Sequence, residues 1–153
     1  MNPGKNFAVL PVVFVAMALS LRVAGEAPDE KARVLLDRSF YIALRRTPRI
    51  MRNSFLEKRL NALVVARGMV SATGENKLFD KRYRIILTDP EAESLGMRIV
   101  YHIYADRLDS IEMLSEHRLY EFSGRLVAYT PLSTKRESYI LDVILEKGAV
   151  VIE

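Results

Sequence analysis

Apolar and polar residues alternate through five short runs in the second part of the chain. In the second run Tyr83, Ile85 and Leu87 fall on one face, and in the third run Tyr101 and Ile103 do the same. A period of two is typical of a β-strand with one buried face. The pattern therefore predicts strands at residues 63–73, 82–88, 97–104, 118–129 and 138–145.

Between the third and fourth runs the apolar spacing changes. Leu108, Ile111 and Leu114 recur at three-residue steps, and Asp106 stands where a helix N-cap is favoured. The spacing predicts one short amphipathic helix over residues 107–115.

The order of these elements predicts an α+β protein in which residues 62–153 form a five-stranded Greek-key barrel. One helix between strands 3 and 4 of such a barrel is the arrangement of the OB-fold. Gly68 and Gly124 lie in the middle of the first and fourth runs, where the strands of a small barrel must coil. A small β-sandwich or a split barrel would produce similar runs.

Two stretches of this region have a characteristic amino-acid sequence. Residues 65–70 read Val-Ala-Arg-Gly-Met-Val, and residues 120–126 read Tyr-Glu-Phe-Ser-Gly-Arg-Leu. Both resemble the OB-fold domains grouped as tRNA-anticodon-binding-like. The resemblance covers the last three-fifths of the chain and implies a nucleic-acid-binding OB domain.

The stretch before the barrel is rich in basic residues and predicts an arm of two helices. The first helix opens at Pro28 and carries Leu36 and Leu44 on its apolar face. Thr47 and Pro48 then end it and supply the N-cap and first residue of the second helix. We expect the arm to pack on the barrel or on a second copy of the chain.

The N-terminus has the pattern of a secretory signal peptide. Lys5 precedes an apolar run over residues 7–21, and the small residues Ala24 and Gly25 follow. The run is shorter than the roughly 20 residues of an ordinary membrane span, so we expect an exported, periplasmic or secreted protein. The alternative is a protein anchored in the membrane by residues 7–21. The predicted organisation is a signal peptide or anchor at 1–25, the basic arm at 26–61 and the barrel at 62–153.

Composition limits the classes of function. The absence of cysteine excludes disulfide bonds and thiolate-bound metals. The formal net charge is +4, but residues 62–153 hold 12 basic and 14 acidic residues, so the predicted barrel itself is slightly acidic. A general binder of phosphate backbones would be expected to carry a net positive charge there.

Few residues suit catalysis. His102 and His117 are the only histidines, and neither has a partner at metal-ligand spacing. Asp89, Glu91 and Glu93 could hold a weak cation, but a solvated acidic turn fits them better, because calcium needs a fuller set of oxygen ligands. The common nucleotide, hydrolase and metalloprotease motifs are missing. We therefore expect no enzymatic activity, no metal and no cofactor.

The outward face of the second and third predicted strands is the candidate binding surface, provided that Tyr83 and Tyr101 point inward. It would present Arg82, Arg84, Arg98, His102 and Tyr104, and the loops on either side add Lys77, Lys81, Lys135 and Arg136. OB-folds commonly bind ligands on this face. Cations beside an aromatic ring serve single-stranded nucleic acids through phosphate contacts and base stacking. The alternative is an ordinary polar surface without a ligand.

A second basic cluster lies in the arm. It consists of Arg45, Arg46, Arg49 and Arg52. Such a cluster could lie along anionic lipid headgroups or dock on an acidic partner. A solvated helix face would have the same composition.

Together these features predict a non-enzymatic exported module that binds a protein or another component of the cell envelope. We expect Arg84, Arg98 and Tyr104 to be its first contact residues. Single-stranded nucleic-acid binding through the same face is the alternative, which the family resemblance favours and the predicted export disfavours. The sequence is also compatible with a homo-oligomer.

Overall fold

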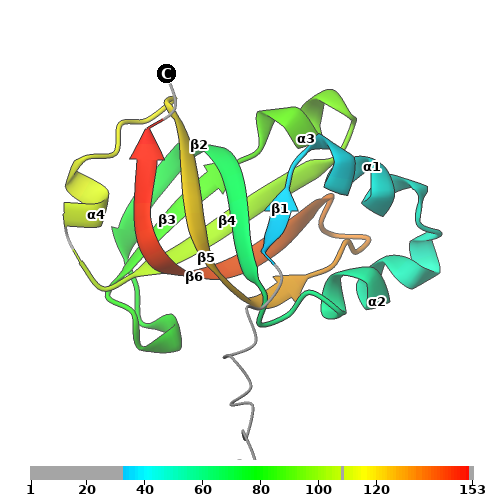
Figure 1. The fold of residues 1–153 in the computed structure, drawn as a ribbon, viewed down its shortest axis with the longest axis horizontal. Coiled ribbons are helices and arrows are strands. Elements are labelled where there is room, and N and C mark those ends of the chain that lie inside the picture. Colours follow the sequence, from blue (N-terminus) through cyan, green and yellow to red (C-terminus); the bar gives the residue numbers. More distant parts are fainter. Residues whose placement is uncertain (1–32, 108, 152–153) are drawn as a thin grey trace, which may run out of the picture.

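A computed structural model describes residues 33–107 and 109–151, which form a mixed six-stranded sheet with short helices packed around it (Figure 1). The protein is therefore of the α+β class. The strands are β1 (Val34–Leu36), β2 (Leu63–Glu75), β3 (Tyr83–Thr88), β4 (Arg98–Ala105), β5 (Leu119–Thr130) and β6 (Ser138–Val151). The helices are α1 (Arg38–Arg46), η1 (Arg49–Met51), α2 (Arg52–Glu57), η2 (Leu78–Asp80), α3 (Pro90–Ser94) and α4 (Asp109–Glu112), where η marks a 3-10 helix.

Hydrogen bonds join five of the strands into a closed ring. The sheet runs in the order β1-β2-β3-β4-β6-β5, and β2 also pairs with β5. The pairs β1–β2 and β4–β6 are parallel, and the other pairs are antiparallel. The ring strands are the five that the alternation predicts, so that prediction is confirmed, although β6 continues as far as Val151.

Buried side chains from every strand of the ring form one apolar core. Ile85 and Leu87 of β3 belong to it, whereas Arg84 and Ile86, which alternate with them, remain partly exposed. This is the alternation that the sequence predicts. The core members from the ring are Val64, Ala66, Val70, Ile85, Leu87, Ile99, Tyr101, Ile103, Tyr120, Phe122, Leu126, Tyr139, Leu141 and Val143.

Two glycines permit close approaches between strands of the ring. A Cβ atom on Gly68 of β2 would lie 2.7 Å from the Cβ of Leu87. A Cβ atom on Gly124 of β5 would lie 2.4 Å from the carbonyl oxygen of Ile144. Both distances are shorter than any real contact, so these positions require glycine. The structure agrees with the prediction that glycine marks the points where the strands coil.

Residues 34–36 form a strand, so the prediction of a helix over this stretch is wrong. β1 pairs in parallel with residues 64–66 of β2. Local spacing does not reveal this pairing, because it depends on backbone groups far along the chain. Helix α1 begins after Asp37, whose carboxylate accepts a hydrogen bond from the Phe40 N–H at 3.0 Å and acts as N-cap. The start expected at Pro28 lies outside the described residues.

The turn after α1 also differs from the prediction. The Thr47 hydroxyl donates a hydrogen bond to the Ala43 carbonyl at 2.8 Å, so it closes α1 and does not cap the next helix. The chain continues as the 3-10 helix η1 and then as α2. Phe40, Leu44 and Leu56 belong to the same core cluster as the ring strands, so both helices pack on the sheet.

The helix predicted at residues 107–115 is shorter in the structure. α4 spans Asp109–Glu112, so Asp106 lies too far before it to be its N-cap, and the Asp106 carboxylate forms an ion pair with Lys81 at 2.5 Å. Leu108, which the sequence places on the apolar face of this helix, lies outside the described residues.

A buried carboxylate ties two helices to the sheet. Asp89 is 2% exposed and caps α3, with one oxygen accepting the N–H groups of Glu91 and Ala92 at 2.9 Å each. The other oxygen accepts hydrogen bonds from the hydroxyls of Tyr41 in α1 and, at 2.9 Å, Tyr101 in β4. The prediction of a solvated acidic turn is therefore wrong for Asp89. Its four hydrogen bonds offset the cost of burying a charge.

Replacing Gly124 by alanine is expected to lower the free energy of unfolding by about 2–3 kcal/mol, because the new methyl group must displace the backbone of β6. The matched substitution Gly74→Ala meets nothing within 4 Å and should change it by less than about 1 kcal/mol. Urea denaturation followed by circular dichroism measures both. Equal effects would contradict the close approach of β5 and β6 at Gly124.

The stability of the protein is expected to fall in alkali. Burial raises the pKa of Tyr41 and Tyr101 far above the ordinary value of 10.0, and the charge of Asp89 adds to the effect. Both tyrosines stay neutral in the folded chain while those of the unfolded chain ionise. Their contribution is therefore complete below pH 10.0 and declines as the pH rises above it.

Urea denaturation at a series of pH values between about 8 and 11 tests this expectation. The double variant Tyr41→Phe/Tyr101→Phe should be less stable at neutral pH, since Asp89 loses two donors, and should lose less stability in alkali. The same alkaline slope in the variant and the parent would show that other groups cause the decline.

Candidate binding site at the β2–β3 loop

Strand pairing determines which side chains share the outward face of the sheet. Arg84 of β3 pairs with Tyr104 of β4, and His102 of β4 pairs with Asp142 of β6. Ile103, between His102 and Tyr104, lies in the core. These four polar side chains therefore lie together on the face that points away from the core, as the sequence predicts for Arg84, His102 and Tyr104.

An open pocket of about 560 Å³ lies where β2 turns into β3. Its lining residues are Glu75, Asn76, Lys77, Arg82, Tyr83 and Arg84. The pocket thus combines three cations, an aromatic ring and an amide with a single carboxylate, all from one hairpin. A cavity of this size lies in the range of small-ligand sites.

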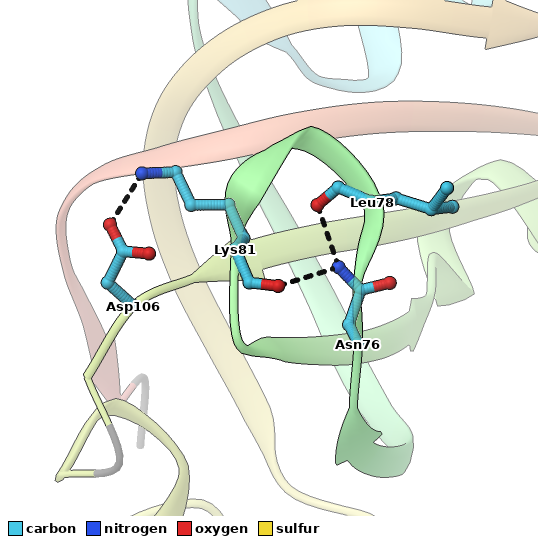
Figure 2. Close-up of polar contacts among 4 residues, drawn as sticks. All are labelled: Asn76, Leu78, Lys81 and Asp106. Atoms are coloured by element: carbon cyan, nitrogen blue, oxygen red, sulfur yellow. Dashed lines mark hydrogen bonds and ion pairs between the residues drawn. The ribbon is translucent and has the colours of Figure 1, made fainter.

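The side chain of Asn76 organises the loop beside this pocket. Its amide Nδ2 donates hydrogen bonds to the carbonyls of Leu78 at 2.9 Å and Lys81 at 3.1 Å (Figure 2). The Asn76 N–H donates to the Arg82 carbonyl at 2.7 Å. The Lys81 ammonium reaches Asp106, just beyond β4, so the loop is closed on itself and held to a neighbouring strand (Figure 2).

The loop contains two exposed apolar side chains and two residues with an uncommon backbone conformation. Phe79 and Asp80 both have positive φ, 56° and 54°, in the left-handed region that bulky residues rarely adopt. Leu78 and Phe79 are 54% and 42% exposed. The Phe79 ring packs edge-on against Tyr104, with centroids 4.9 Å apart. The turn therefore holds an exposed aromatic ring next to the pocket.

The cations of the pocket differ from several other basic residues in their ion pairing. Elsewhere, ion pairs with carboxylates hold Arg67, Lys81, Arg98, Arg107 and Arg125. Within the described part of the chain, Lys77, Arg82 and Arg84 form no ion pair. Like charges gathered in this way repel one another, and an anionic ligand would relieve the repulsion.

Tyr104 and His102 do not form the exposed platform that the sequence suggests. Tyr104 is 1% exposed, because Phe79 lies against its ring and its hydroxyl donates a hydrogen bond to Asp142 at 2.8 Å. Burial, with a smaller effect of Asp142, raises the pKa of Tyr104 to about 12, and Arg84 opposes that rise. The His102 Nδ1 lies 3.4 Å from the same carboxylate. The expectation that Tyr104 is exposed is wrong.

The remaining predicted residues of this face lie at its other end. Arg98 pairs with Ser138 and forms an exposed ion pair with Glu137 at 3.1 Å. Lys135 and Arg136 belong to the exposed β5–β6 turn beside it. The length of β4, about 20 Å, separates this group from the pocket. The structure thus brings Arg82 and Arg84 together with Lys77 and leaves Arg98 apart from them.

The arginines of the arm divide into two kinds. Arg45 donates to the Leu95 carbonyl at 2.9 Å. Arg52 donates to the carbonyls of Thr47 at 3.0 Å and Arg45 at 2.9 Å, and so satisfies backbone groups at the end of α1. Arg46 and Arg49 are exposed, and neither has an ion-pair partner among the described residues.

The sequence does not predict that Asn76, Tyr83 and Phe79 belong to the site. Asn76 stands between the first two predicted strands, and asparagine in turns often bonds to nearby backbone, but the two hydrogen bonds of its side chain depend on the path of the loop. Tyr83 follows the alternation of the core face yet is partly exposed at the end of β3. Phe79 carries no local signal, because its position depends on a positive φ.

The comparisons with known proteins identify no family. Neither a protein-family model nor a curated protein matches the chain. A "putative aspartyl-tRNA synthetase" from Leishmania major Friedlin is similar in structure, with 12% identity and a TM-score of 0.42. The similarity covers 84% of this chain and only 22% of that one.

A "putative nucleic acid-binding lipoprotein" from Klebsiella pneumoniae subsp. pneumoniae MGH 78578 is also similar, with 13% identity and a TM-score of 0.45. Here the similarity covers 78% of this chain and 91% of the other. Likeness at this level does not identify a function. Over the described residues, no helix is both long and apolar enough to cross a membrane.

Asn76→Ala is expected to loosen the loop without unfolding the sheet, because two loop carbonyls lose their donor. We expect a cost of about 1–2 kcal/mol and faster amide hydrogen exchange in residues 77–82. The control Lys81→Met removes only the partly exposed ion pair to Asp106 and should cost less than about 1 kcal/mol. Equal exchange rates in the Asn76→Ala variant and the parent would show that the amide does not hold the loop.

Proposed function

We propose that this chain is a non-enzymatic binding module with an OB-like barrel, and that the β2–β3 loop binds single-stranded nucleic acid. The closed ring of five strands supports the first part. In OB-folds, the loop between the first two strands of the barrel is a common binding element. The pocket lies in the corresponding loop of this ring.

The observation that carries the proposal is the gathering in one pocket of three cations that form no ion pair with any described residue. Lys77, Arg82 and Arg84 line it, and Glu75 is the one acidic residue among the lining residues. This local charge outweighs the slightly acidic balance of residues 62–153, because a ligand at the surface responds mainly to charges within the Debye length, about 8–10 Å.

Aromatic side chains supply the second requirement of a single-strand site. Tyr83 lines the pocket and Phe79 is exposed beside it. Bases that are not paired can stack on such rings while the cations contact the phosphates. The hydrogen bonds of Asn76 hold the loop in place before a ligand arrives, which reduces the entropy lost on binding.

A second candidate is an exported module that binds another protein of the cell envelope. The exposed apolar side chains of Leu78 and Phe79 at the tip of the loop favour it. Export itself is supported by the sequence pattern of residues 1–25, which lie outside the described residues. In this case Leu78 and Phe79 would be the main contacts, and the cations would contribute to steering.

Fluorescence anisotropy with a labelled oligothymidylate tests the first proposal. Three phosphate contacts predict that the affinity falls roughly 20-fold between about 50 and 200 mM salt. Arg82→Glu/Arg84→Glu should remove most of the binding at low salt. The matched control Arg46→Glu/Arg49→Glu changes the charge by the same amount at a different surface and should retain it.

Three results would count against this function. They are no binding of the oligonucleotide at low salt, binding without salt dependence, and equal loss in the two charge-reversed variants. Circular dichroism of each variant establishes that the fold is retained. Salt-independent capture of a protein partner that is lost in Leu78→Ser/Phe79→Ser would favour the second candidate.

A further inference from the structure

The turn between α1 and α2 presents the most exposed large apolar side chain of the described chain. Ile50 is 92% exposed and its neighbour Met51 is 56% exposed. The core contains Phe40 and Leu56 from the two flanking helices, so the apolar character of the turn is not needed to cover that core. Exposed neighbouring apolar residues of this kind mark interaction sites.

The turn is ordered by its own hydrogen bonds. The Met51 N–H donates to the Pro48 carbonyl at 2.8 Å, and the Thr47 N–H donates to the Ala43 carbonyl at 3.0 Å. Arg52 donates to the carbonyls of Thr47 in the turn and of Arg45 in the last turn of α1. The fold therefore holds Ile50 and Met51 in their exposed position.

Basic residues surround these two side chains. The segment 45–59 contains six basic residues and one acidic residue, Glu57. Arg59 lies over the Phe55 ring, 3.6 Å from its centroid, and Arg45 and Arg52 bind backbone carbonyls. The other basic residues of the segment, Arg46, Arg49 and Lys58, make no such contact with any described residue. Arg46 and Arg49 are exposed on either side of Pro48.

We propose that this turn docks on an anionic lipid surface. Ile50 and Met51 enter the boundary between headgroups and acyl chains, and Arg46 and Arg49 contact the headgroup phosphates. Each basic residue near such a surface adds electrostatic attraction, while exposed apolar side chains gain from leaving water. A nucleic acid would match the arginines but leave Ile50 in water, which is why the lipid is favoured.

This surface is distinct from the proposed nucleic-acid site. Figure 1 shows the α1–α2 turn and the loop between β2 and β3 on opposite sides of the molecule. When this chain docks on a lipid surface through the turn, its pocket therefore remains accessible.

Because the chain has no cysteine, a single introduced cysteine can carry an environment-sensitive fluorophore. We suggest labelling Ile50→Cys and, as a control, Thr73→Cys, an exposed position of β2. Vesicles of phosphatidylcholine with and without phosphatidylglycerol are then added to the full chain. The label at position 50 should shift to the blue only with phosphatidylglycerol, and the label at position 73 should not respond.

Charge reversal separates the contribution of the turn arginines to lipid binding from that of the pocket arginines. Arg46→Glu/Arg49→Glu in the Ile50→Cys background should weaken the response to lipid at least tenfold, whereas Arg82→Glu/Arg84→Glu should leave it unchanged. The local label distinguishes this contact from any attachment through residues 7–21, which would bring the protein to the vesicle without moving position 50 out of water.

Several outcomes would overturn the proposal. One is a protein that floats with the vesicles while the label at position 50 stays in water. Others are equal responses at positions 50 and 73, or a response of position 50 to an oligonucleotide and not to anionic vesicles. The last result would assign the turn to nucleic acid.

Discussion

The ring exists because β2 has different partners along its length. Its first part pairs with β5 and its last part pairs with β3, with a register irregularity between Val70 and Ala72 near the change. Gly68, just before that irregularity, lets the backbone of β2 pass close to Leu87. The β2–β3 loop leaves from the end of this strand, so the coiling of β2 also determines where the pocket lies. The packing of the two glycines and the orientation of the β2–β3 loop thus depend on the same constraint.

Much of the sheet can be predicted from the sequence because its signal is local. A strand with one buried face alternates regardless of its partner, and Ile85, Leu87, Tyr101 and Ile103 follow this rule. β1 is different, since a three-residue strand has too few positions to show a period. Its residues also fit the spacing of a helix, and only the open edge of β2 decides between the two. The expected cap of α4 has a long-range partner as well, because Asp106 is ion-paired with Lys81 from another loop.

The candidate site is predictable only in its composition. The sequence places Arg82 and Arg84 on one strand with Lys77 nearby. Whether carboxylates neutralise these cations depends on which residues the fold brings close to them. Arg98 resembles Arg84 in the sequence pattern, yet it has a carboxylate within reach at Glu137. The burial of Tyr104 likewise depends on the conformation of the loop that carries Phe79. Electrostatic character at a surface is therefore a tertiary property, even where every charged residue is known.

The pairing of β2 with β5 has a consequence for how the chain acquires its structure. Leu63 pairs with Arg125 and Met69 with Leu119, so this contact closes a long loop. Loop-closure entropy is lost before such contacts form, and topologies of this kind fold slowly. During synthesis the edge of β2 remains without β5 until most of the chain has left the ribosome. The nascent chain therefore exposes an unpaired apolar strand while the residues up to β5 are being synthesised. Chaperones act on β-rich proteins under this condition.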